Sequence, residues 1–246
     1  MHYDNLLELV KNRRSCRKFK TAPVSDEDVQ RIIEVARWAP SGAHAQPWEF
    51  IVINQPESKK RIIETMDVYN KFMRKIETVR KPELRFIPSP PGFVRAPVFI
   101  ILCGDRRTSD AYPLHTKQLR EASHFVSGMA SAFLYMNLAA TTLGLGTQWV
   151  SAIAHPYVQT MIKDFLGVPP AYEFYDMLAV GYPVQPPKEK LVRNRDEMVH
   201  FNAYDQTKYR TDAEIECFIT GLRQARKQPQ YLHYENILPG PSLPPA

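Results

Sequence analysis

The most informative stretch of the chain runs from Arg13 to Phe50 and reads RRSCRKFKTAPVSDEDVQRIIEVARWAPSGAHAQPWEF. It opens with three guanidiniums and a hydroxyl within five residues, and it closes with a loop of small residues that ends in Pro-Trp. A planar guanidinium makes paired, charge-assisted hydrogen bonds to phosphate oxygens, and small side chains let a flat ring approach the backbone closely. The stretch therefore predicts one ligand with a phosphate at one end and a ring at the other.

An amphipathic helix is predicted between the two ends of this stretch. Ser25, with Asp28 three residues later, resembles a capping box, in which the Ser side chain accepts a backbone N–H of the first turn. Pro40 ends the helix, because a proline disfavours helical geometry in the residue before it. Apolar side chains recur at helical spacing and give the helix one buried face: Val29, Ile32, Ile33 and Ala36.

The rest of the chain alternates between helical and extended patterns. Apolar spacing predicts further helices over residues 5–11, 56–78, 119–143 and 155–166, and one more that begins at Thr211. Strands are predicted over residues 48–53, 98–103, 147–151 and 172–180. The mixture indicates an α+β fold around a central sheet. We expect one domain over residues 1–200 and a C-terminal extension over 201–246, made of a helix and a Pro-rich tail.

Two segments indicate where a partner and a substrate would bind. The predicted helix over 119–143 is rich in Ala, Ser and Gly, which permits close packing against another helix, including the same helix of a second copy. The segment from Tyr69 to Pro97 becomes irregular and Pro-rich, as lids and binding loops often are. We therefore expect self-association through the first segment and substrate contacts from the second.

The composition narrows the class of protein. Of the 246 residues 44% are hydrophobic and 24% charged, which is ordinary for a globular protein. No apolar run approaches the roughly 20 residues that cross a bilayer, and the start lacks the cationic leader and apolar core of a secretory signal. The three cysteines are widely spaced, which argues against a disulfide framework and a zinc site. We expect a cytoplasmic protein with no metal site and no membrane partner.

The net charge of +6 raises the question of nucleic acid. The basic residues are scattered in small groups, and no nucleic-acid-binding motif is present. Anionic small ligands account for the charge, so no nucleic-acid partner is expected. Cys16 lies inside the cationic cluster, and an electropositive setting can lower a thiol pKa. We nevertheless interpret Cys16 as a passive small residue.

Five segments resemble, in order, the motifs of the flavin-dependent nitroreductase family. Residues 13–17 resemble its RRSxR phosphate motif, and residues 39–48, APSGAHAQPW, resemble its AP-S-x-x-x-x-QPW segment. The later matches are GLGT at 144–147, VGYP at 180–183 and Arg193. The resemblance covers residues 5–200, and the wording of the second motif is nearest to the branch that contains iodotyrosine deiodinase.

The resemblance implies an α+β fold with a mostly antiparallel sheet, an intertwined homodimer, and FMN bound at the dimer interface. By position, the phosphate and ribityl chain would be held by Arg13, Arg14, Ser15, Arg17 and Arg193, with Arg195 as the fallback for the last. The flavin ring would be contacted by Pro40, Ser41, Gly42, Val150 and Ser151. The substrate would meet the backbone N–H of Ala43 and the side chain of Tyr69.

The same resemblance implies the activity. NADH or NADPH would reduce the flavin, and a small aromatic acceptor of the nitroaromatic, quinone or halophenol type would then occupy the same face in a ping-pong cycle. A flavin carries this chemistry without a side-chain nucleophile, so we name no catalytic acid or base. The alternative class is a flavin-binding protein without ordinary reductase turnover, such as a flavin-consuming enzyme or a sensor.

Reductive dehalogenation of a halotyrosine is a narrower alternative. The deiodinase branch holds its substrate with a Glu, a Tyr and a Lys from a lid. Tyr69 and Lys81 are counterparts for the Tyr and the Lys, but Thr65 stands where the Glu is expected. Core packing is the other interpretation of Tyr69, and structural hydrogen bonding is the other interpretation of His44, which otherwise could donate a proton beside the ring.

Overall fold

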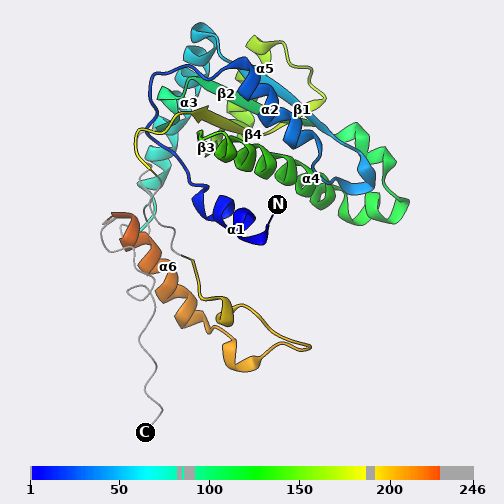
Figure 1. Ribbon diagram of the computed structural model, residues 1–246, viewed down its shortest axis with the longest axis vertical. Helices are drawn as coiled ribbons and strands as arrows, with labels where there is room; N and C mark the ends of the chain where they lie inside the picture. The colour runs from blue at the N-terminus through cyan, green and yellow to red at the C-terminus, as the bar shows by residue number, and fades with distance from the viewer. Residues whose placement is uncertain (1, 82–84, 86–91, 187–191, 228–246) are drawn as a thin grey trace. The chain divides into compact units, whose positions relative to one another are not determined.

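The computed structural model describes residues 2–81, 85, 92–186 and 192–227. The chain divides into two compact units, Met1–Lys188 and Glu189–Ala246 (Figure 1). The boundary that we expect after residue 200 falls inside the second unit. Most of the Pro-rich segment between 82 and 91, and the tail from 231, lie outside the described residues.

A four-stranded sheet forms the centre of the first unit. Its strands are β1 (Trp48–Ile53), β2 (Val98–Asp105), β3 (Gly146–Val150) and β4 (Tyr172–Gly181). The order is β1-β2-β4-β3 and each pairing is antiparallel, which confirms the predicted α+β class and the antiparallel sheet. The register of β2 and β4 shifts between Leu102 and Cys103. A shift of this kind bends and twists the strands locally.

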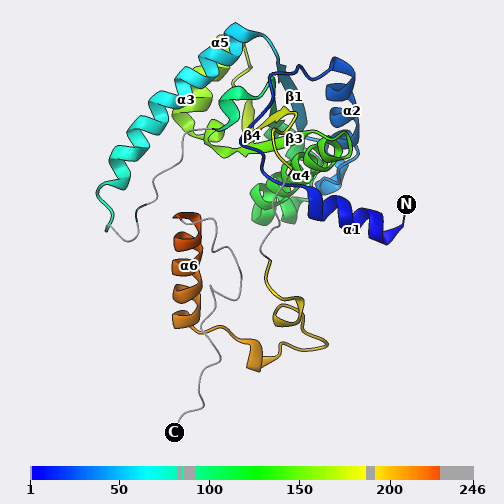
Figure 2. The same cartoon turned by 60° about the vertical axis from the view of Figure 1, so that its left-hand side comes forward.

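Helices cover both faces of this sheet (Figures 1 and 2). The helices α2 (Asp26–Arg37) and α4 (Leu114–Thr142) pack on one face, and α3 (Pro56–Glu77) and α5 (Pro156–Leu166) pack on the other. Successive residues of β2 and β4 alternate between the two cores, so Ile100 and Leu178 face α4 while Ile101 and Met177 face α3. This double coverage explains why β2 is apolar on both faces. A first helix, α1 (Tyr3–Asn12), packs against α4.

The element boundaries follow local chemistry. The Ser25 hydroxyl accepts the Asp28 backbone N–H at 3.1 Å, which confirms the predicted start of α2. The helix ends at Arg37, three residues before Pro40. In contrast, α4 begins five residues before the predicted position, directly after Pro113, because its first turn is polar and carries no apolar periodicity. Likewise β3 ends at Val150, and Ser151 opens the short 3-10 helix η5 (Ser151–Ala154).

The described part of the second unit holds two 3-10 turns, η6 (Arg195–Glu197) and η7 (Gln206–Lys208), and one helix, α6 (Asp212–Lys227). Thr211 and Glu214 form a capping box at the start of α6: Glu214 accepts the Thr211 N–H at 2.7 Å, and the Thr211 hydroxyl accepts the Glu214 N–H at 3.3 Å. The predicted helix beginning at Thr211 is thereby confirmed. Across the described parts of both units, none of the helices combines the length and apolarity that a membrane span requires.

Asp176 is a buried acid in β4, and it makes folding pH-dependent. The residue is 7% exposed, and its carboxylate accepts the indole N–H of Trp149. Burial raises its pKa from the ordinary 3.8 to about 6, against the opposing effect of the Trp149 hydrogen bond. In that window the folded protein binds more protons than the unfolded chain, so the free energy of unfolding falls as pH rises from 3.8 to about 6.

Asp176→Asn should remove this pH dependence, because an amide oxygen still accepts the indole N–H but does not titrate. Between about pH 4 and about pH 7, the wild type should lose roughly 3 kcal/mol of unfolding free energy relative to the variant. Urea unfolding of both proteins across this range measures the difference. Parallel stability profiles for the two proteins would show that Asp176 titrates normally.

Candidate cofactor and active site

The arginine cluster, residues 13–17, lies along the outer edge of β3. Ser15 forms a parallel bridge with Thr147, and the Cys16 N–H donates to the Thr147 carbonyl at 2.7 Å. Further along, the Lys20 N–H donates to the Tyr182 carbonyl at 2.8 Å. The fold therefore places three predicted motifs, at 13–17, 144–147 and 180–183, side by side.

Gly146 makes this close approach possible. A Cβ at Gly146 would lie 3.0 Å from the Cys16 Sγ and 2.7 Å from the Cys16 Cβ, and the second distance is shorter than side chains tolerate. Cys16 is half-buried, and this burial raises its thiol pKa in spite of the neighbouring Arg17. Burial therefore outweighs the lowering of the thiol pKa that an electropositive setting can cause, in agreement with a passive role for Cys16.

The three guanidiniums differ in how tightly they are held. Arg13 caps the C-terminus of α1, and Arg14 donates from Nη1 to the Arg13 carbonyl at 2.8 Å. Arg17 is exposed, and its backbone is crossed by Gly92, where a Cβ would lie 2.6 Å from the Arg17 carbonyl oxygen. No acidic side chain within the described ranges forms an ion pair with Arg13 or Arg17. Both positive charges are therefore available to an anion.

The predicted ring loop, Pro40 to Pro47, is strained and tightly held. Three of its non-glycine residues have positive φ: Ala43 (48°), His44 (54°) and Gln46 (45°). Each such residue costs about 1–3 kcal/mol, and the conformation persists only where its surroundings determine it. Here Ser41 supplies two anchors: its hydroxyl accepts the Gln46 N–H and its carbonyl accepts the His44 N–H, each at 3.0 Å. Strain concentrated in one loop favours a functional role.

The wall behind this loop is built by α4 and the segment before it. A Cβ at Gly42 would lie 3.0 Å from His124 Nδ1 and 3.2 Å from a ring carbon of Tyr112. Ser41 rests on Gly128 of α4, whose Cβ position lies 3.3 Å from the Ser41 Cβ. The predicted ring contacts Pro40, Ser41 and Gly42 are therefore one rigid segment. The sequence does not indicate Tyr112 or His124 as its supports.

Ala43→Gly should relieve part of this strain, because glycine adopts positive φ without a steric penalty. The matched control is Ala45→Gly, where φ is −69° and no relief is available. We expect the first variant to be more stable than the second by about 1–2 kcal/mol in urea unfolding. Equal stabilities of the two variants would contradict the strained loop.

The remaining predicted residues of the first unit lie at the other end of β3. Val150 is buried in the core under α3 and α5, and Ser151 is exposed at the start of η5. Tyr69, on α3, packs partly against the same core and places its ring 4.4 Å from that of His155, which follows η5. Tyr69 thus lies beside the segment that begins at Ser151. His155 carries no sequence signal beyond its place four residues after Ser151.

Lys81 and Thr65 are the other two positions that the sequence links to substrate binding. Lys81 is exposed, and Thr65 donates its hydroxyl to the Arg61 carbonyl at 2.9 Å on α3.

Arg193 and Arg195 belong to the second unit, where Arg193 pairs with Glu197 at 3.6 Å and Arg195 with Asp196 at 3.3 Å. A role for either arginine in phosphate binding stays a prediction.

The donor set fits an anionic, elongated ligand. The cluster next to Thr147 and the loop on Gly128 are both anchored to α4, because Thr147 donates its hydroxyl to Asn137 of that helix. Gly128 and Asn137 are separated by roughly 14 Å along the helix axis.

Near the loop and β3, two buried side-chain atoms lack a hydrogen-bond partner among the described residues, namely the Tyr112 hydroxyl and Gln148 Oε1. No group of three metal-binding side chains occurs within the described ranges.

The family model of the nitroreductase family matches residues 10–182, well over half of the chain. The chain belongs to the nitroreductase family. This result confirms the resemblance inferred from the five motifs, and it covers the arginine cluster, the ring loop and all four strands of the sheet.

Relatives of the chain show the breadth of this nitroreductase family. A protein of Archaeoglobus fulgidus, provisionally named NADH dehydrogenase/NAD(P)H nitroreductase, is 26% identical over 180 residues, 73% of this chain and 86% of that protein. The 5,6-dimethylbenzimidazole synthase of Rhodospirillum rubrum is 28% identical over 180 residues, 73% of this chain and 82% of the synthase. A solved structure of iodotyrosine deiodinase with FMN and 3-iodo-L-tyrosine has a TM-score of 0.63 at 24% identity, covers 81% of this chain and 100% of that chain, and shares the fold.

Proposed function

We propose that the chain is an FMN-dependent oxidoreductase that passes electrons from NADH or NADPH to a small aromatic acceptor by a ping-pong mechanism. The observation that carries the proposal is the pairing of the arginine cluster with the edge of β3 and of the strained loop with α4, within one unit of a nitroreductase-family chain. A bound flavin would supply the hydride chemistry, and the protein would supply binding, orientation and electrostatics.

The arginine cluster would hold the phosphate end of FMN. Arg13, Arg14 and Arg17 offer charge-assisted hydrogen bonds to its oxygens, and Ser15 offers a hydroxyl for the phosphate or the ribityl chain. Arg193 is the proposed fourth cation, with Arg195 as its fallback. This end of the site fixes the cofactor by charge.

The strained loop and the end of β3 would hold the flavin ring. Pro40, Ser41 and Gly42 present small groups and backbone to a flat ring, and the backbone of Val150 together with Ser151 would reach its polar edge. The Ala43 N–H and the Tyr69 ring would face the acceptor. We name no side chain as a catalytic acid or base; the side chains would bind and orient both ligands, and solvent would supply the proton that accompanies hydride transfer to the acceptor.

Self-association is part of the proposal. The outer face of α4 carries exposed apolar side chains seven and eight residues apart, Leu119, Val126 and Leu134, and Leu119 is 82% exposed. Such a stripe on a long helix is best buried against a second copy. We also place the protein in the reducing cytoplasm, because its three cysteines, Cys16, Cys103 and Cys217, are free.

A screen of acceptors against the reduced protein tests this function. Nitroaromatics, quinones, halophenols and halotyrosines are each mixed with the anaerobically reduced flavoprotein, and reoxidation is followed by stopped flow. We expect fast reoxidation by at least one of the first three classes. Reaction with halotyrosines alone would favour a dehalogenase. Consumption of the flavin itself would favour the second candidate, a flavin-consuming enzyme.

A further inference from the structure

Gln148 occupies the middle of β3, between two parts of the proposed cofactor site. Side chains at 146, 148 and 150 share one face of the strand, because successive residues of a strand alternate. On that face Gly146 lies against Cys16 of the arginine cluster, and Val150 enters the core beneath α3 and α5. The Gln148 amide therefore extends from the stretch of strand that joins the phosphate end of the site to its ring end.

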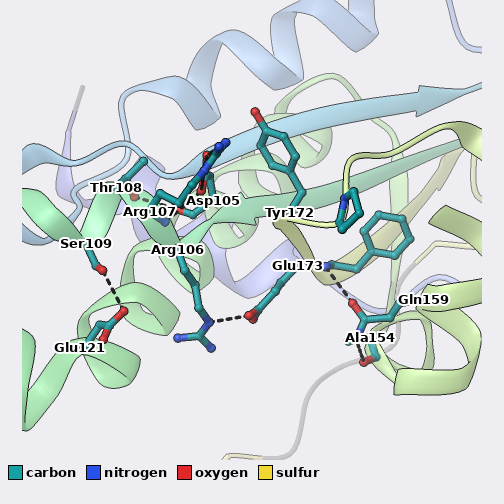
Figure 3. Close-up of polar contacts among 12 residues, drawn as sticks. Asp105, Arg106, Arg107, Thr108, Ser109, Glu121, Ala154, Gln159, Tyr172 and Glu173 are labelled. Atoms are coloured by element: carbon teal, nitrogen blue, oxygen red, sulfur yellow. Dashed lines mark hydrogen bonds and ion pairs between the residues drawn. The ribbon is translucent and has the colours of Figure 1, made fainter. Parts of the chain in front are cut away.

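The carbonyl end of this amide is buried without a partner. Gln148 Oε1 is enclosed, and no donor among the described residues reaches it. Folded proteins pair nearly all buried polar atoms, so an orphaned acceptor requires an explanation. Two other amides of the same unit are satisfied at both ends. Gln159 donates to the Ala154 carbonyl at 3.2 Å, as Figure 3 shows, and accepts the Phe174 N–H at 3.4 Å. Asn137 donates to Phe133 and accepts from Thr147, each at 2.8 Å.

We propose that Gln148 Oε1 accepts a hydrogen bond from a ribityl hydroxyl of the bound flavin. This inference rests on the proposed function. In FMN the segment between phosphate and ring is a polyhydroxylated chain, and its hydroxyls are donors that a neutral carbonyl oxygen can accept. A phosphate offers only acceptors near neutral pH and would not pair with this oxygen. The position of Gln148 between Gly146 and Val150 thus matches the one part of the cofactor whose chemistry it complements.

Gln148→Met tests the assignment, because it keeps an unbranched side chain of similar size and removes the amide. The apoprotein of this variant should unfold at the same temperature as the wild type or above it, since an unpaired buried acceptor is lost. Its Kd for FMN, measured by quenching of flavin fluorescence, should rise about tenfold, the value of one hydrogen bond. Riboflavin, which has the ribityl chain and no phosphate, should lose affinity by the same factor.

Gln159→Met is the matched control. It removes an amide that already has two partners in the protein, so the apoprotein should melt at a lower temperature while the Kd for FMN stays unchanged. An unchanged Kd of Gln148→Met would overturn the assignment and would indicate that a buried water pairs with the oxygen. A loss confined to FMN, with riboflavin unaffected, would also overturn it. Absence of FMN binding in the wild type would instead remove the proposed function, and this inference with it.

Discussion

Gly146→Ala is expected to destabilise the protein and to release its flavin. The new methyl group would lie 2.7 Å from the Cys16 Cβ, which is fixed by the Cys16 N–H bond to the Thr147 carbonyl. Overpacking of this kind costs about 1–3 kcal/mol of stability. Because the displaced segment carries Arg13, Arg14 and Arg17, FMN binding should weaken by roughly 10–100-fold, the value of one charge-assisted hydrogen bond to the phosphate. Urea unfolding and a fluorescence titration with FMN measure the two effects.

The same contact supplies a rescue for this variant. Cys16→Gly removes both atoms that the new methyl group would meet, and the next neighbour, the Pro183 Cβ, lies at an ordinary 3.4 Å. The double variant Cys16→Gly/Gly146→Ala should therefore bind FMN more tightly than Gly146→Ala alone. If the single variant retains wild-type affinity, the close pairing of the arginine cluster with β3 does not position the cofactor.

Arg17→Ala should weaken FMN binding by roughly 10–100-fold, the value of a charge-assisted hydrogen bond to a phosphate. Arg17 is exposed and forms no ion pair with the described residues, so the substitution removes a ligand contact without leaving a buried charge unpaired. The loss should shrink as salt is raised, because salt screens exposed charges. Riboflavin, which lacks the phosphate, should bind wild type and variant alike.

Arg37→Ala serves as the control for general charge. Arg37 is an exposed arginine at the end of α2 whose guanidinium pairs with Glu34 on the same helix. The two variants carry the same net charge, and only Arg17→Ala should lose FMN. Equal losses in both would mean that overall positive charge, and no specific phosphate contact, attracts the cofactor.

Local signals were sufficient for much of the fold. The cap at Ser25, the apolar periodicity of α2, α3 and α5, and the apolar run of β2 each act over a few residues, and the structure confirms them. The predicted start of α4 lies five residues too late, and the predicted third strand runs one residue too far, to Ser151. In both places the local residues carry no signal that marks the true boundary.

The supports of the site depend on tertiary contacts that no short pattern encodes. The positive φ of Ala43 and Gln46 arises from the anchors at Ser41 and the wall at His124, and alanine and glutamine carry no preference for it. The orphaned oxygen of Gln148 is likewise visible only once the surrounding elements enclose it. Motif order predicts the two ends of the proposed site, and packing shows which contacts hold those two segments in place.

The most direct test of the proposed oxidoreductase is anaerobic reduction of the FMN-loaded protein by NADH and by NADPH, followed through the absorbance of oxidised flavin. We expect at least one of the two nicotinamides to bleach this absorbance in a single reductive half-reaction, and an aromatic acceptor to restore it. Purified protein that is colourless and fails to take up FMN on reconstitution, or bound FMN that neither nicotinamide bleaches, would contradict the account.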